Sequence, residues 1–170
     1  LALSPEMLKD GIENGDMCVV HSVEGAHSLQ GNEAGKTFGE EMVSHPDDIE
    51  EEVLANLQSF YDRGVAYLGL AHFYPNHCVN PVFPYPEYAA KHLKWRDVLG
   101  KWDETKGLTP LGVKVVEKML ELGMLIDISH CTLAARKQIY ELVDSHGKSE
   151  CLIVTHIGAF EINPISYNLQ

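Results

Sequence analysis

Apolar and polar residues follow two different periods along the chain. Short, continuous apolar runs of the kind that form buried strands are separated by longer stretches whose apolar residues recur every three to four positions, as in helices. Strands are predicted at Met17–Glu24, Val65–His72, Met124–His130 and Cys151–His156. Because these runs are apolar throughout, they are typical of parallel strands covered by helices. The pattern therefore predicts an α/β fold, with the first strand buried like the others.

The predicted helices carry start and stop signals. Ser4 and Pro5 suit the N-cap and first position of one helix, and Thr109 and Pro110 suit those of another. Further helices are predicted at 47–64 and 132–147, and Gly64 and Gly123 are predicted to end the second and third. The apolar positions expected to face the core are Ile49, Val53, Leu57 and Tyr61 in the second helix, and Leu111, Val115, Met119 and Leu122 in the third.

Composition narrows the class of protein. The 170 residues, 45% hydrophobic and 22% charged, fit a single globular domain covering residues 1–170. A net charge of −12 argues against nucleic acid or an anionic membrane as partner. No apolar run is long enough to predict a transmembrane span. The chain starts at Leu1 and contains no recognisable signal peptide, so the sequence leaves the compartment open.

Each predicted strand ends in a side chain able to bind a metal. The four residues are Glu24, His72, His130 and His156. In a parallel sheet or barrel all carboxyl ends lie on one face, where active sites form. We therefore expect these four side chains to share one site. A carboxylate and neutral imidazoles suit a divalent transition metal, most often zinc, which makes metal-assisted hydrolysis the leading reaction class.

Alternate residues of a strand face the same side, so the residues two and four positions before Glu24, His130 and His156 are expected to share the face of these side chains. These residues are small or apolar: Ser22, Val20, Ile128, Ile126, Val154 and Leu152. This predicts that they face the interior of a barrel. Asp127 has the opposite parity and is expected to face the helix layer in a structural role.

At these residues the chain resembles the membrane (renal-type) dipeptidase family of the amidohydrolase superfamily. The matching segments are "VEGAHS", "GVAYLGLAH", "GLTPLGVKVVEKMLELGMLIDISHCT" and "IVTHIGA". They occur in the family's order and cover most of Val19–Ala159. The block Gly107–Thr132 is long and specific, whereas "VEGAHS" alone would be a weak signal.

The resemblance implies a (β/α)₈ TIM barrel that binds two zinc ions and cleaves the amide bond of a small peptide. It implies that Glu24 bridges the two metals and that His130 and His156 bind the second. It implies that His72 contacts substrate and polarises the scissile carbonyl. His27 is a motif residue expected to lie behind the ligands.

Two departures from the family pattern affect these expectations. The His-x-Asp pair of the first strand and the Asp of the last strand are absent, and only about four strand–helix units are present where a full barrel needs about 250 residues. The chain thus looks like a central piece of a larger enzyme, in which one or both zinc ions could be missing. We expect the isolated piece to be inactive and to aggregate or pair with another chain, including a second copy.

The second departure is Tyr167, eleven residues after His156, where family members place an Arg for the substrate carboxylate. We predict that Tyr167 lies in the substrate-binding region. Residues 73–106, after the His72 strand, are predicted to form an insertion near the substrate site. Its aromatic residues, Phe73, Tyr74, Phe83, Tyr85 and Tyr88, suit either a hydrophobic lid or ordinary packing. Two other functions remain open: a non-catalytic binding protein derived from the barrel, and an amidohydrolase acting on another amide or an ester.

Overall fold

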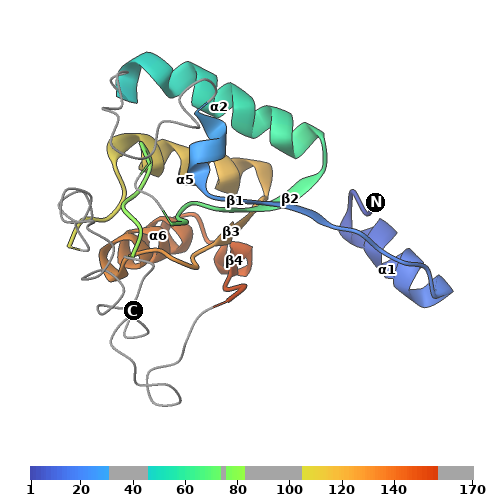
Figure 1. Ribbon diagram of the computed structural model, residues 1–170. Coiled ribbons are helices and arrows are strands. Elements are labelled where there is room, and N and C mark those ends of the chain that lie inside the picture. Colours follow the sequence, from blue (N-terminus) through green and yellow to red (C-terminus); the bar gives the residue numbers. More distant parts are fainter. Residues whose placement is uncertain (31–45, 74–75, 83–104, 157–170) are drawn as a thin grey trace, which may run out of the picture.

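The computed structural model describes residues 1–30, 46–73, 76–82 and 105–156, and its centre is a parallel sheet of four strands (Figure 1). The strands are β1 (His21–Glu24), β2 (Val65–Gly69), β3 (Leu125–Asp127) and β4 (Leu152–Ile153). They lie in the order β1-β2-β3-β4, and every neighbouring pair is parallel. Sequential order without reversal is the order of a barrel, whereas a doubly wound sheet changes direction. The fold is thus α/β and forms part of a TIM barrel, as the sequence predicts.

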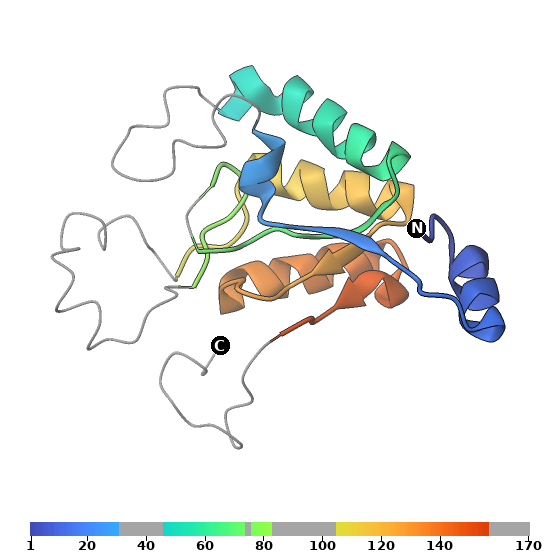
Figure 2. The ribbon, with the colours of Figure 1, turned by 45° about the vertical axis from the view of Figure 1, so that its right-hand side comes forward.

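The helices between successive strands lie along one face of the sheet (Figure 2). The elements are α1 (Pro5–Asn14), α2 (Pro46–Asp62), α5 (Pro110–Leu122) and α6 (Leu133–Ser145), with short 3₁₀ helices η1 (Ala26–Leu29) and η3 (Ser149–Cys151). Helix α1 has no buried residue and extends away from the other elements (Figure 1). Among the described residues, no helix combines the length and apolar character that crossing a membrane requires.

The helix ends confirm the signals in the sequence. Ser4 caps α1, and its Oγ accepts a hydrogen bond of 3.2 Å from the backbone N–H of Met7. Thr109 caps α5 in the same way, and its Oγ1 accepts a hydrogen bond of 3.0 Å from the backbone N–H of Gly112. Helices α1 and α5 both end at a glycine in the left-handed region, where a side chain would cost energy. The predicted capping residues therefore lie at the ends of these helices.

The hydrophobic core lies between the sheet and helices α2, α5 and α6. Leu68 and Ile126, which lie opposite each other in neighbouring strands, are fully buried and belong to this core. The buried helix residues are Ile49, Val53 and Leu57 of α2, Leu111, Val115, Val116, Met119 and Leu120 of α5, and Ala135, Ile139 and Val143 of α6. The helical spacing thus predicted most of the core. Leu122 of α5 is only partly buried, and Tyr61, in the last turn of α2, is 42% exposed.

The first strand differs from its prediction. It is not a buried strand over Met17–Glu24 but a short one from His21, and Met17 and Val20 are exposed. Within the described residues β1 pairs only with β2, so its other side lacks a neighbour that would bury it. Apolar character in this segment therefore did not correspond to a buried strand.

The predicted assignment of side chains to faces is wrong for β3 and β4. Ile126 and Leu152 are in register with Leu68 and pack towards the helices, not the interior. Asp127 is in register with Gly69, which is in register with Glu24, so Asp127 shares the face of Glu24. The count failed because β2, β3 and β4 each end three residues before their histidine, and period-two alternation stops where the strand stops.

Candidate metal site at the carboxyl ends of the strands

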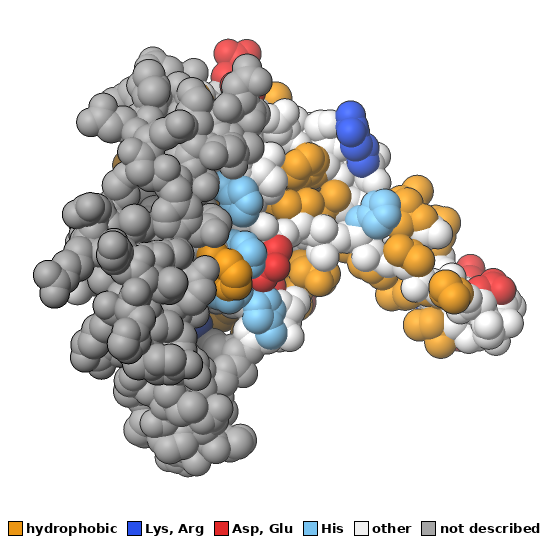
Figure 3. Space-filling view, in the orientation of Figure 1, with side chains coloured by type: hydrophobic (Ala, Val, Ile, Leu, Met, Phe, Trp, Pro, Cys, Tyr) orange, Lys and Arg blue, Asp and Glu red, His pale blue; other side chains and the backbone are white. Residues whose placement is uncertain are grey.

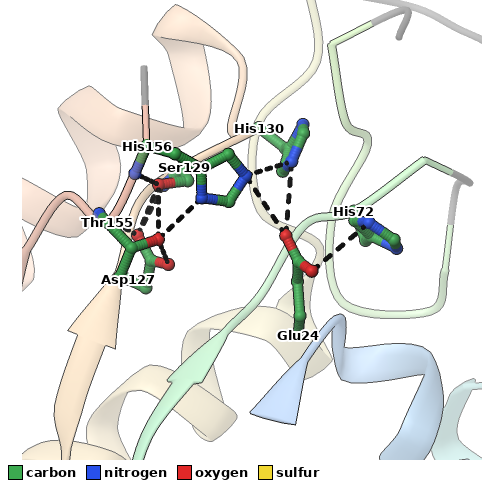
Figure 4. A network of polar contacts seen from close by, with 7 residues as sticks. All are labelled: Glu24, His72, Asp127, Ser129, His130, Thr155 and His156. Carbon is green, nitrogen blue, oxygen red and sulfur yellow. Dashed lines mark hydrogen bonds and ion pairs between the residues drawn. The ribbon is translucent and has the colours of Figure 1, made fainter. Parts of the chain in front are cut away.

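Glu24, His130 and His156 converge at the carboxyl ends of β1, β3 and β4 (Figure 4). The Oε1 atom of Glu24 lies 3.4 Å from Nε2 of His130 and 3.3 Å from Nε2 of His156. The two Nε2 atoms are 2.7 Å apart. On the molecular surface, histidine side chains gather around a carboxylate (Figure 3). The structure therefore brings together the three side chains that the sequence singled out as metal ligands.

The spacing of these atoms fits a zinc ion. Ligand atoms held 2.0–2.2 Å from zinc in tetrahedral geometry are separated from one another by about 3.3–3.6 Å. Both distances from the Glu24 oxygen agree with this separation. The two imidazole nitrogens are closer than a bound ion would leave them, at the distance of a direct hydrogen bond. The two nitrogens would have to separate by about 0.6–0.9 Å to admit an ion, and a carboxylate with two imidazoles is a donor set that suits zinc.

The conformation of His130 directs its ring into this cluster. His130 has φ of 60°, the only positive value at a non-glycine residue in the described part of the chain. Its backbone is held there by a 2.8 Å bond from the N–H of Val82 to its carbonyl, while the N–H of Cys131 bonds to the carbonyl of Ile128. Such a conformation costs about 1–3 kcal/mol and is concentrated at functional sites.

His72 approaches the other oxygen of the same carboxylate. Its Nε2 lies 3.5 Å from Oε2 of Glu24, and its ring is 5.3 Å from the ring of His130. Phe73 stacks on His72, with ring centroids 4.1 Å apart, and meets the ring of His130 edge-on. His72 therefore lies beside the trio of Glu24, His130 and His156, with the ring of Phe73 stacked on it.

His27 lies behind His72 rather than in the trio. Its ring stacks with that of His72 at 6.3 Å between centroids. The turn that places it requires glycine at position 25, because Gly25 has φ of 97° and an added Cβ would overlap the ring of His27. The backbone continues to bond to β2 through this turn, with Ala26 N–H donating to the carbonyl of Leu70 at 2.9 Å.

Burial favours the neutral form of two of these imidazoles by lowering their pKa. It lowers the pKa of His130 below its ordinary value, and the neighbouring His156 and His72 lower it further. Burial likewise lowers the pKa of His27, with His72 adding to the effect. A metal binds the neutral form of histidine, so the environment of His130 favours the form that is needed.

A group of polar residues that the sequence prediction missed lies behind His156. Asp127 was expected to face the helices, but its carboxylate accepts hydrogen bonds from Ser129 and Thr155 on the side of the metal site (Figure 4). One signal could have revealed it. Ser129 precedes His130 and Thr155 precedes His156, so a hydroxyl stands directly before each of the two imidazoles.

Part of the predicted substrate region lies outside the described residues. This holds for Tyr167 and for most of the insertion 73–106, including Tyr74, Phe83, Tyr85 and Tyr88. The described segment 76–82 is held against β2 and α5. Asn76 is buried there, and its side chain donates to the carbonyl of Leu70 and accepts from the N–H groups of Cys78 and Val79.

A parallel sheet with a carboxylate and imidazoles at its carboxyl ends is the arrangement of a metal-dependent hydrolase built on a TIM barrel. Residues 45–170 match the family described as Membrane dipeptidase (Peptidase family M19). The chain belongs to this family, whose members are metal-dependent and generally use zinc. Glu24 precedes the matched residues.

Individual relatives agree with this assignment. Dipeptidase 3 of Mus musculus is 39% identical over 89 residues, which cover 52% of this chain and 16% of that protein. An uncharacterized dipeptidase of Schizosaccharomyces pombe is 38% identical over 76 residues, covering 45% of this chain and 15% of that protein. The crystal structure of the probable dipeptidase PvdM from Pseudomonas aeruginosa superposes with a TM-score of 0.54 and 26% identity. It covers 83% of this chain and 28% of that one. The chain thus spans less than a third of each relative's length.

Proposed function

We propose that the protein containing this chain is a zinc-dependent hydrolase that cleaves the peptide bond of a dipeptide. The observation that carries the proposal is the convergence of Glu24, His130 and His156 at the carboxyl ends of three parallel strands, in a chain of the membrane dipeptidase family. A zinc ion held by these residues would lower the pKa of its bound water to about 7 and so supply hydroxide at neutral pH. The protein residues then have to bind, orient and polarise the substrate.

His72 suits the task of polarising the scissile carbonyl. Its Nε2 points at Glu24 from outside the metal-binding trio, and its side chain is 25% exposed. A protonated Nε2 there could donate a hydrogen bond to a carbonyl oxygen, and such a donor commonly contributes about 10²–10³-fold to turnover. Phe73, stacked on its other side, keeps the ring in place and offers the substrate an apolar contact.

Glu24 suits the role of a bridging carboxylate between two zinc ions. Its Oε1 faces His130 and His156, while its Oε2 faces away from them towards His72. One carboxylate with its two oxygens turned to different sides can bind two metals about 3.5–4 Å apart. The remaining ligands of the first metal would have to come from outside the residues described.

The test is metal-dependent hydrolysis by the full-length protein. The chelated enzyme and the enzyme with zinc restored would be assayed against a panel of dipeptides, N-acyl amino acids and simple esters. Activity on dipeptides that disappears on chelation and returns with zinc supports the proposal. Zinc-dependent activity confined to other amides or esters would refute the dipeptidase assignment, and zinc binding without any hydrolysis would favour a binding protein.

A further inference from the structure

Asp127 lies behind His156 at the centre of four hydrogen bonds. Its Oδ1 accepts from the backbone N–H and the hydroxyl of Ser129, at 2.9 Å and 2.7 Å, and from the N–H of Thr155 at 3.3 Å. Its Oδ2 accepts from the hydroxyl of Thr155 at 2.5 Å. The residue is 3% exposed. Burial alone would raise its pKa, but the hydrogen bonds from Thr155 and Ser129 lower it, so the carboxyl is ionised.

An ionised carboxylate fixes where the hydroxyl proton of Thr155 must lie. A carboxylate only accepts, so Thr155 donates its one proton to Asp127. The distance of 2.5 Å is that of a strong charge-assisted bond. The Oγ1 of Thr155 also lies 2.8 Å from Nδ1 of His156. Since the hydroxyl proton is already used, Nδ1 of His156 has to be the donor in that contact.

The proton on Nδ1 determines the state of the opposite nitrogen. A neutral imidazole carries one proton, so Nε2 of His156 presents a lone pair. That nitrogen is the one directed at Oε1 of Glu24 and at His130 (Figure 4). The contact also limits rotation of a ring that is itself 53% exposed. The backbone N–H of His156 also donates a hydrogen bond of 3.3 Å to the hydroxyl oxygen of Ser129.

We propose that Thr155 and Asp127 are positioning residues that hold His156 as its Nδ1-protonated tautomer, with the Nε2 lone pair aimed at the metal site. Thr155 transmits the orientation from the buried carboxylate to the ring, and Ser129 holds the carboxylate in place. Groups of this kind commonly change metal affinity or activity by about 10–100-fold. The effect on zinc rests on the proposed function, whereas the tautomer of His156 does not.

The experiment compares Thr155→Val, Thr155→Ser and Asp127→Asn with the unmodified protein. Long-range ¹H–¹⁵N NMR of histidine-labelled, metal-free protein reports which ring nitrogen of His156 carries the proton, at a pH where the imidazole is neutral. Zinc alone is then titrated in competition with a chelating dye. Thr109→Val is the matched control, because it makes the same chemical change at a helix cap that contacts neither His130 nor His156.

The unmodified protein should show protonated Nδ1 on His156. Thr155→Val should mix the two tautomers and weaken zinc binding about 10–100-fold, and Thr155→Ser should restore both properties. Asp127→Asn should behave like Thr155→Val, and Thr109→Val should leave the tautomer unchanged. Two results would overturn the inference. One is a protonated Nε2 on His156 in the unmodified protein, which can be observed even if a variant fails to fold. The other is an unchanged tautomer in a folded Thr155→Val variant. If no form binds zinc, the proposed function fails while the tautomer still decides this inference.

Discussion

Nε2 of His156 lies 2.7 Å from Nε2 of His130, although the two residues are 26 positions apart in the chain. Two neutral imidazoles can approach this closely by sharing one proton, whereas a zinc ion bound between their lone pairs would hold them further apart. The Oε1 atom of Glu24 faces both nitrogens and supplies a negative charge at the same point. The pair therefore belongs to a site that favours a positive charge between its members.

The charge of Glu24 is the first property to test. Glu24→Gln keeps the shape of the side chain but removes its charge. The zinc affinity should therefore fall by more than the roughly 10–100-fold that is typical when a group behind a metal ligand is removed. The side chain is 45% exposed, so the melting temperature of the metal-free protein should hardly change. Competition titration with zinc measures the affinity, and Glu51→Gln on the exposed face of α2 is the control. Unaltered zinc affinity in Glu24→Gln would contradict the metal-site assignment.

His72 should affect turnover more than metal content. His72→Ala removes a group that lies beside the trio, so the zinc content should stay near that of the unmodified enzyme while kcat falls by about 10²–10³-fold. Metal analysis and steady-state kinetics on the full-length protein measure the two effects separately. Should the variant lose zinc in proportion to its activity, His72 would be a ligand instead.

The metal-free protein should lose stability as the pH falls below the ordinary pKa of histidine. Burial lowers the pKa of His27 and of His130 in the folded state from 6.5, so the unfolded chain binds protons more readily. The contribution of these two histidines to the free energy of unfolding is therefore complete above pH 6.5. It is lost as the pH falls from there through their lowered pKa values in the folded state. Thermal unfolding measured over this range should show the decline, and His27→Phe should make it shallower. A melting temperature that rises on acidification would contradict the assigned direction.

Much of the fold was predictable because its signals are local. Caps such as Ser4 and Thr109 and the four-residue spacing in α5 depend only on neighbours in sequence, and both were correctly predicted. The grouping of Glu24 with His130 and His156 was also predictable, because parallel strands bring their carboxyl ends to one edge. These inferences needed the order of elements but no distance.

The orientation of side chains near the site was not predictable in the same way. Parity counting assumed that each strand continues to its histidine, but β3 ends at Asp127 and His130 adopts a left-handed conformation. Whether Asp127 faces the helices or the site depends on where the hydrogen bonding between strands stops. That point is set by two strands together and cannot be predicted from the sequence of one of them. Exposure of Val20 likewise depends on what lies beside β1.

Gly112 gives a prediction in which two effects have opposite signs. In the helix α5, replacing glycine by alanine should by itself stabilise the protein by up to about 1 kcal/mol. The segment that follows His72 crosses this position, however, and an added methyl group would overlap the backbone carbonyl of Cys78. That carbonyl already accepts a 2.9 Å hydrogen bond from the N–H of Thr109, so it cannot move away without breaking this bond.

Overpacking of this kind costs about 1–3 kcal/mol, and backbone yields less readily than a side chain. We therefore expect Gly112→Ala to lower the free energy of unfolding despite the helix preference for alanine, as measured by urea denaturation. Gly69→Ala is the matched control, because its added methyl would lie 3.7 Å from the nearest atom, an ordinary contact. A gain in stability for Gly112→Ala would mean that the segment after His72 does not pack against α5 as described. The placement of His72 beside Glu24 would then lose its support from that side.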